Sequence, residues 1–224
     1  MQAKQNGFLG TLLVVFITLV ITASLGELYS FIIDTFHMTP WKAVVVAHML
    51  VAAVLYLISS AVRSALRFQG TSYLAWVPAL TILIGAFVLA LSSQRGGASY
   101  SVTGSSEIIY VISTLTLIPI FEEIVFRAGV TSVLHRFAGP VWSIWFSALA
   151  FSVAHTQPTF ERLINLKVGF LIGPFILGIC CDMIVRRWGK LWPAIAFHSA
   201  CNATVYIFST WNPAWLSRLS GLYM

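Results

Sequence analysis

The sequence is dominated by long apolar runs that are separated by short polar segments. A membrane-spanning helix needs about 20 predominantly apolar residues, because it rises about 1.5 Å per residue across a hydrocarbon core about 30 Å thick. By this criterion the chain is predicted to contain seven spans, near residues 8–33, 41–62, 73–92, 107–134, 140–157, 168–185 and 190–210. No segment reads as a β-strand. We therefore predict an all-α fold, a polytopic transmembrane helical bundle.

The runs follow one another closely, which indicates a single domain. Only the segment from Ser92 to Ser106 is rich in Gly and Ser and reads as a flexible connection. No stretch is left for a separate soluble domain. We predict one integral-membrane domain over residues 1–224, with N-terminal helices in 1–106 and, in 107–210, core helices that carry most of the intramembrane polar residues.

Composition supports a membrane protein and excludes other classes. Of the 224 residues, 58% are hydrophobic and only 9% are charged, and the mean hydropathy is +0.88, so a soluble domain would lack the polar surface that water requires. The formal net charge of +6 comes from Lys and Arg placed mostly between apolar runs, where they suit anionic lipid headgroups. We expect the lipid bilayer as a partner and no nucleic acid.

The distribution of basic residues predicts the orientation. With seven spans, seven Lys and Arg residues fall on the side of the N terminus and five on the other side. The positive-inside rule places the richer side in the cytoplasm. We predict a multi-pass protein of the cell membrane with a cytoplasmic N terminus. The first run, from about Phe8 to Ile33, exceeds the length of a signal-peptide core, so we expect a retained helix.

The three cysteines, Cys180, Cys181 and Cys201, all lie inside apolar segments. Their number is odd and their spacing matches neither a disulfide framework nor a metal-binding motif. We interpret them as small packing residues.

The fourth apolar run contains the richest polar cluster, Glu122-Glu123 followed by Arg127. Ionisable groups inside a bilayer are costly unless they are paired or face a wet cavity, so they mark candidate functional sites. Adjacent helical residues point about 100° apart, whereas residues four apart share a face. Glu123 is therefore predicted to pair with Arg127, leaving Glu122 free for chemistry. The alternative is an ion-pair network that only joins helices.

Pro119 stands one turn before the two carboxylates. Proline has no backbone N–H and disturbs the preceding turn of a helix. We therefore expect the helix to open at Pro119, with a kink that admits water.

Two later helices carry further polar pairs four residues apart. In the fifth predicted span Phe151 and His155 share a face, and in the seventh His198 and Asn202 do so. Each pair alone can serve as interhelical glue. Three helices with strong polar groups at similar depth nevertheless favour one site, although His155 is predicted to lie about 10 Å to one side at the rise of a helix.

Other polar residues are weaker candidates. Glu27 and His48 can line the cavity, but single groups near helix ends more often make one structural hydrogen bond. Asp182 and Arg186 are four residues apart and are predicted to form an intrahelical pair. Three glycines near Pro174, namely Gly169, Gly173 and Gly178, indicate close packing or a break in the sixth span.

The three polar motifs together resemble the EExxxR, FxxxH and HxxxN signature of the CPBP family, which comprises CAAX proteases and bacteriocin-processing enzymes. All seven positions match, and their order and placement in helices agree. The first three helices carry no mark of the family. The resemblance implies an intramembrane endopeptidase of the glutamic type, similar to type II CAAX prenyl proteases.

The resemblance also implies roles for the matching residues. Glu122 with His155 would activate a water molecule, and His198 with Asn202 would stabilise the oxyanion. Glu123, Arg127 and Phe151 would orient the site. The substrate would be a membrane-anchored or lipidated protein or peptide, and no metal or other cofactor is expected. No Ser or Cys forms a recognisable nucleophile motif with a His, which favours attack by activated water.

Three alternatives remain open. Two imidazoles with one or two carboxylates can also hold zinc with an open position for water, which would give a zinc-dependent intramembrane protease. The family also includes noncatalytic members, such as immunity factors or scaffolds. Intramembrane carboxylates and histidines relay protons in transporters, although no inverted repeat is visible.

Overall fold

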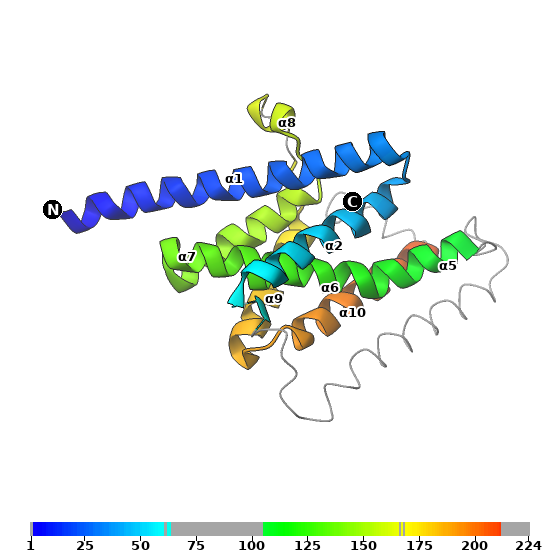
Figure 1. Ribbon diagram of the computed structural model, residues 1–224. Helices are drawn as coiled ribbons and strands as arrows, with labels where there is room; N and C mark the ends of the chain where they lie inside the picture. The colour runs from blue at the N-terminus through cyan, green and yellow to red at the C-terminus, as the bar shows by residue number, and fades with distance from the viewer. Residues whose placement is uncertain (1, 61, 64–104, 166, 168, 212–224) are drawn as a thin grey trace.

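The structure is a computed structural model that describes residues 2–60, 62–63, 105–165, 167 and 169–211 (Figure 1). All regular elements within these residues are helical, which confirms the all-α class. The predicted span at 73–92 lies outside the described residues, so the number of seven spans stays a prediction.

The N-terminal helices α1 (Gln2–Phe36) and α2 (Pro40–Ile58) are joined by a short turn. His37 at φ 49° ends α1. Thr39 is extended (φ −65°, ψ 148°), because the ring of a following proline disfavours the helical region. Pro40 then begins α2 at a position where no backbone N–H is needed. Local chemistry therefore fixes the boundary between the first two predicted spans.

The central segment is a continuous helical run of five elements. In chain order they are α5 (Ser105–Ile112), the π-helix η2 (Ser113–Leu117), α6 (Ile118–Glu123), the π-helix η3 (Ile124–Val130) and α7 (Thr131–Ala154). Within α7, Gly139 has φ 75° and ψ −179°, and Pro140 follows it. The chain turns back at this point (Figure 1), between the predicted spans 107–134 and 140–157.

The expected kink at Pro119 does not form. The residues around it keep helical dihedral angles, and the run passes through η2 directly into α6. In η2 the hydrogen bonds reach one residue further than in an α-helix, and the Ile118 N–H donates to the Ser113 carbonyl. The wider helical turn accommodates the missing N–H of Pro119 without a break.

The C-terminal part contains three more helices. The short α8 (Phe160–Ile164), which the apolar pattern did not predict, is capped by the Thr159 hydroxyl. It is followed by α9 (Ile172–Trp188) and α10 (Trp192–Trp211), close to the predicted spans 168–185 and 190–210. Gly189 ends α9 in the left-handed region (φ 65°), and its N–H donates to the Val185 carbonyl.

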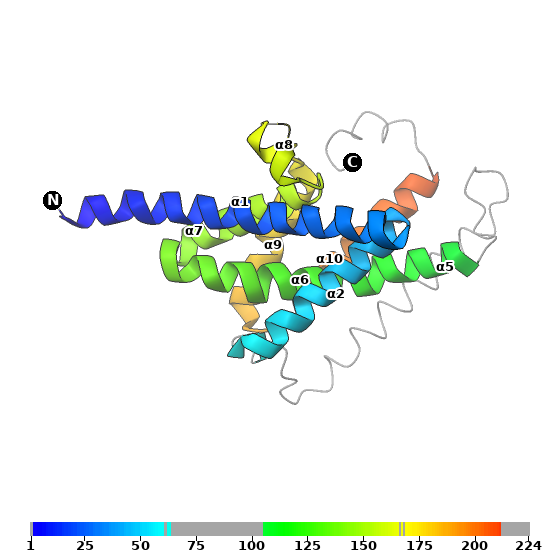
Figure 2. The ribbon, with the colours of Figure 1, turned by 45° about the horizontal axis from the view of Figure 1, so that its top comes forward.

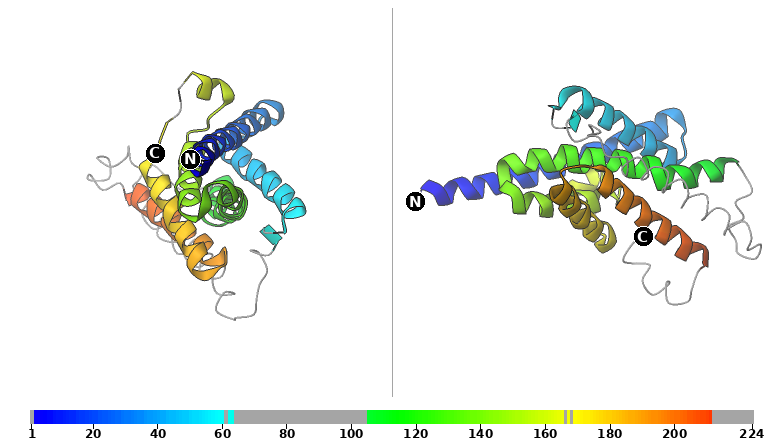
Figure 3. Two further views of the ribbon diagram at one scale, coloured as in Figure 1. Left: turned by 90° about the vertical axis from the view of Figure 1, so that its left-hand side faces the viewer. Right: turned by 90° about the horizontal axis from the view of Figure 1, so that it is seen from below.

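The central run lies in the middle of the bundle. Seen end-on, α1 and α2 lie on one side of it and α9 and α10 on the other (Figure 3), and α8 protrudes beyond α1 (Figure 2). The main core joins the N-terminal helices to the central run through buried side chains such as Leu25, Phe126, Leu134 and Phe151. This arrangement brings the polar residues of the central run between helices from both ends of the chain.

Apolar side chains also cover the outer surface of the bundle. Phe16, Leu57 and Val141 are each more than half exposed. Within the described residues, two helical segments are long and apolar enough to cross a membrane, Phe16–Phe36 and Ile109–Ala154, and Lys42–Ile58 is a shorter apolar helix. An exposed apolar surface of this kind fits lipid as solvent.

Gly178 of α9 packs closely against α7. A Cβ at this position would lie 2.9 Å from Ala148 Cα and 3.6 Å from an Arg127 side-chain nitrogen. Since backbone cannot move aside cheaply, Gly178→Ala is expected to lower the free energy of unfolding by about 1–3 kcal/mol. Thermal unfolding of the purified protein in micelles measures the change. Ile176→Ala, on the exposed side of α9, is the control, and equal melting temperatures for the two variants would contradict this packing.

Candidate active site

Glu122 and Glu123 form the last turn of α6, directly before η3. Glu123 is fully buried and Glu122 is 5% exposed. As adjacent helical residues they point in different directions, and their partners differ accordingly.

Glu123 makes the predicted ion pair with Arg127, which is confirmed. Arg127 Nε donates to Glu123 Oε2 at 3.1 Å, and both side chains are completely buried. Arg127 also donates from a second nitrogen to the Ser147 hydroxyl of α7 at 3.2 Å. The pair therefore fixes the orientation of Glu123 and connects α6 and η3 to α7.

Asp182 completes this network, and the prediction that it pairs with Arg186 is wrong. Asp182 lies 3.6 Å from Arg127 and accepts a hydrogen bond of 2.8 Å from the Thr131 hydroxyl. Arg186 instead donates to the Ser143 hydroxyl at 2.9 Å. Asp182 is buried between α9 and the central run, where a buried cation is a stronger partner than a side chain near the surface.

The His198 ring lies between the two glutamates. Its Nδ1 is 3.0 Å from Glu123 Oε1, and its Nε2 is 3.6 Å from Glu122 Oε2. His198 is 1% exposed. The His198 imidazole of α10 thus connects Glu123, which is paired with Arg127, to Glu122. Each ring nitrogen faces a carboxylate oxygen that can accept a hydrogen bond.

Phe151 packs between the two motif histidines. Its ring is edge-on to His155 (4.5 Å between centroids) and to His198 (5.7 Å), and the Arg127 guanidinium lies 4.8 Å above its centre. His155 Nδ1 is 2.8 Å from the Phe151 carbonyl, which only accepts hydrogen bonds. In a neutral His155 ring the proton is therefore on Nδ1, and Nε2 is free to accept another.

Asn202 has a backbone partner that sequence reasoning did not anticipate. Its side-chain amide donates to the Thr114 carbonyl at 3.0 Å. In the π-helical register the donor for this carbonyl would be residue 119, but Pro119 has no N–H. Asn202 satisfies the carbonyl that the proline leaves open, and one amide hydrogen remains for other partners.

A cavity of about 110 Å³ lies beside Glu122. Its lining includes Glu122, His155, His48 and Tyr29. His155 therefore lines the same cavity as Glu122, although the sequence predicted an offset of about 10 Å along the helix axis. Glu122 Oε2 is buried, and no residue in the described part of the chain forms a hydrogen bond with it. The volume exceeds the roughly 10–15 Å³ that one water molecule needs, so the carboxylate faces space that can hold water.

Glu27 and His48, the weaker candidates for the site, have different surroundings. Glu27 accepts a hydrogen bond from the Phe160 N–H at the start of α8, which is the single structural bond expected. His48 does not lie at a helix end but is buried 3.9 Å from Glu122. In the sequence, the feature that indicates a site residue at His48 is its position in the middle of an apolar run.

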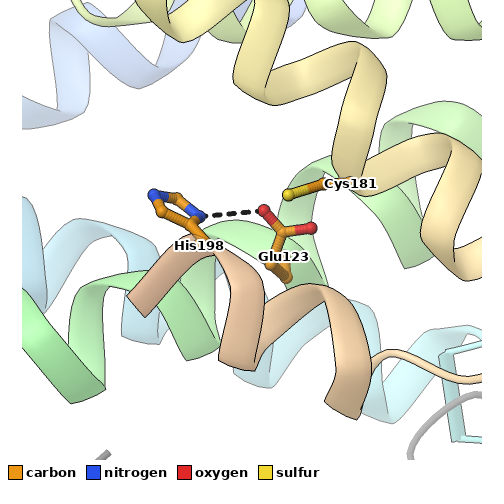
Figure 4. A group of neighbouring side chains, drawn as sticks. All are labelled: Glu123, Cys181 and His198. Carbon is orange, nitrogen blue, oxygen red and sulfur yellow. Dashed lines mark hydrogen bonds and ion pairs between the residues drawn. The ribbon is translucent and has the colours of Figure 1, made fainter. Parts of the chain in front are cut away.

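Glu123, Cys181 and His198 form a group that could hold a metal ion, with one ligand atom from each within 4.8 Å of the others (Figure 4). The sequence left open a zinc site of two imidazoles with one or two carboxylates. This group instead has one imidazole and includes Cys181, which the sequence indicated as a packing residue. Both Glu123 oxygens are occupied, and the Arg127 guanidinium would repel a cation at this point. The group therefore fits an ion-pair centre better than a metal centre.

The comparison with protein families agrees with the three motifs. Residues 104–204 match the family described as type II CAAX prenyl endopeptidase Rce1-like. This range runs from before the Glu122 motif to Asn202 and includes every motif residue. No curated protein and no solved structure matches the chain. This match confirms the resemblance inferred from the motifs and supports a CPBP/CAAX protease family assignment for residues 104–204.

Proposed function

We propose that the protein is an intramembrane endopeptidase of the glutamic type, in which Glu122 and His155 activate a water molecule. The observation that carries this proposal is the buried Glu122 carboxylate, which has an oxygen without a hydrogen-bond partner among the described residues and faces a cavity that His155 also lines. A carboxylate in such surroundings is suited to take a proton from water.

The reaction follows from these positions. Water in the cavity gives a proton to Glu122, and its oxygen attacks the carbonyl carbon of the scissile peptide bond. His155, with its Nδ1 proton held by the Phe151 carbonyl, accepts a hydrogen bond from the water through Nε2 and orients it. The proton then passes to the leaving nitrogen as the carbon–nitrogen bond breaks, which yields a carboxylate and an amine.

The oxyanion that forms during attack needs hydrogen-bond donors. The proposed donors are the second amide hydrogen of Asn202 and the Nε2 proton of a doubly protonated His198, because Nδ1 already donates to Glu123. His198 Nε2 lies 3.6 Å from Glu122. The bond from Asn202 to Thr114 supports this role, because it fixes the side chain to the central run. Glu123 and Arg127 hold His198 in place through the Glu123 contact.

The proposed substrate is a membrane-anchored protein or peptide with a prenylated C-terminal CAAX sequence, as the name of the matching family suggests. A lipid anchor would bring the peptide to the membrane depth at which a site inside apolar helices can reach it. The apolar surface of the bundle is suited to contact such an anchor.

A zinc-dependent protease is the alternative that the sequence left open. Glu123, Cys181 and His198 lie close enough to bind a metal, but the Glu123–Arg127 ion pair fits a cation poorly. Metal analysis of the purified protein and cleavage in the presence of a zinc chelator distinguish the two mechanisms. We expect full activity in the chelator. Stoichiometric zinc whose removal abolishes cleavage would favour the zinc-dependent protease.

The proposed function is tested with a quenched fluorescent peptide that carries a farnesylated CAAX terminus. Purified protein in proteoliposomes is expected to release the three C-terminal residues, which mass spectrometry identifies. The same peptide with an unmodified cysteine is the control and should be cleaved at least about tenfold more slowly, since a buried prenyl chain contributes several kcal/mol of membrane binding. Failure to cleave either peptide would exclude this substrate class.

A further inference from the structure

His48 of α2 lies beside Glu122 although it is outside the segment that matches the family. Its Nε2 is 3.9 Å from Glu122 Oε1, the residue is 3% exposed, and among the residues that the structure describes none forms a hydrogen bond with Nε2. The other nitrogen, Nδ1, lies 3.0 Å from the Tyr29 hydroxyl of α1 and 3.0 Å from the Val44 carbonyl. Thus α2 reaches the carboxylate that the proposed reaction uses, and α1 contacts His48 through Tyr29.

The surroundings of Nδ1 allow two arrangements of the neutral ring. In the first, Nδ1 carries the proton and donates to the Val44 carbonyl, which leaves the unprotonated Nε2 facing a carboxylate oxygen. In the second, the Tyr29 hydroxyl donates to Nδ1, and the proton on Nε2 points toward Glu122. A carbonyl with a helical donor can still accept an imidazole proton, as the Phe151 carbonyl does from His155. At His48, however, the first arrangement would set the unprotonated Nε2 against the Glu122 carboxylate and would deprive the Tyr29 hydroxyl of Nδ1 as its acceptor. The second arrangement therefore pairs each donor with an acceptor.

Tyr29 and His48 lie where they can influence the reaction at Glu122. Tyr29 and His48 line the same cavity as Glu122 and His155. A separation of 3.9 Å is too long for a direct hydrogen bond, but such bonds are often long in a free enzyme and shorten when substrate binds. A donor on Oε1 would hold the carboxylate in one orientation while it accepts the proton of water.

We propose that Tyr29 and His48 are positioning residues of the active site: the Tyr29 hydroxyl donates to His48 Nδ1 and so keeps the Nε2 proton directed at Glu122 Oε1. This proposal rests on the proposed function. It extends the site beyond the three family motifs to α1 and α2, both of which pack against the central run.

The kinetic test uses three substitutions and the farnesylated CAAX peptide. His48→Leu is expected to lower kcat about 10- to 100-fold with little change in KM, the range for losing a hydrogen bond to a charged group. His48→Gln places an amide donor close to the position of Nε2 and should recover most of this loss. Tyr29→Phe alone should lower kcat. Added to His48→Gln, it should have no further effect, because glutamine has no ring tautomer for the Tyr29 hydroxyl to fix.

Controls separate positioning from packing. Tyr56→Phe alters an exposed tyrosine of α2 and should leave kcat unchanged, and the melting temperature is measured for every variant. If His48→Leu and Tyr29→Phe lower only the melting temperature, or if His48→Gln is as slow as His48→Leu, the positioning role is wrong.

A second measurement does not depend on cleavage. Nitrogen NMR of the full chain with ¹⁵N-labelled histidine in micelles reports which ring nitrogen carries the proton, and His48→Gln identifies the His48 signal among the five histidines. We expect the proton on Nε2 alone, and a shift toward Nδ1 in Tyr29→Phe. Protonation of Nδ1 in the native protein overturns the proposal. Protonation of Nε2 in a protein that cleaves no peptide counts against the proposed function only.

Discussion

Replacing Glu122 with glutamine is expected to abolish peptide hydrolysis while the protein remains folded. Glutamine has nearly the same size but cannot take a proton from water. Loss of a general base lowers the rate by about 10²–10⁴-fold, so kcat for the farnesylated CAAX peptide should fall at least 100-fold. Glu122 has no ion pair with Arg127 comparable to that of Glu123, and the melting temperature should therefore stay close to that of the native protein.

Two matched substitutions make this result specific. Glu161→Gln removes an exposed carboxylate of α8 and should change neither activity nor stability. Glu123→Gln removes one of the two carboxylates that pair with Arg127 and should lower activity and melting temperature together. Glu122→Gln with activity near the native level would mean that another group is the base. A biological function that persists in this variant without cleavage would favour a noncatalytic or transport protein.

The sequence predicted those parts of the fold that depend on neighbours along the chain. The reversal at Gly139 lies where two predicted spans meet, because a glycine at positive φ followed by proline interrupts a helix locally. The kink predicted at Pro119 does not form, because part of the compensation comes from a residue far along the sequence. The lost hydrogen bond of Pro119 is absorbed by a π-helical turn and by Asn202, which comes from a helix far along the sequence.

The same distinction applies to the site. The Glu123–Arg127 pair could be predicted, since residues four apart share a helix face. The contact of Asp182 with Arg127 could not, because helical periodicity does not determine how α9 is rotated against the central run. His48 was undervalued for the same reason: only the packing of α2 brings it to Glu122. The roles of the seven motif residues remain predictions, which the substitutions at Glu122 and Arg127 test.

Arg127→Met is expected to cause the largest loss of stability. Arg127 is the common partner of two buried carboxylates, at 3.1 Å from Glu123 and 3.6 Å from Asp182. Methionine fills much of the volume but leaves both acids without a cation. Breaking a buried pair in this way costs about 3–5 kcal/mol, so the variant should melt far below the native protein or fail to accumulate. Thermal unfolding and the folded fraction after purification measure the effect.

Arg186→Met is the matched control, because Arg186 is exposed and bonds only to the Ser143 hydroxyl. Its cost should not exceed about 1 kcal/mol, as for a surface contact. Equal stability of the two variants would mean that the carboxylates do not need Arg127. A triple variant, Arg127→Met with Glu123→Gln and Asp182→Asn, removes the unpaired charges and should regain most of the lost stability. If it folds but stays inactive, the network is needed to hold His198 against Glu122 and not only to join helices.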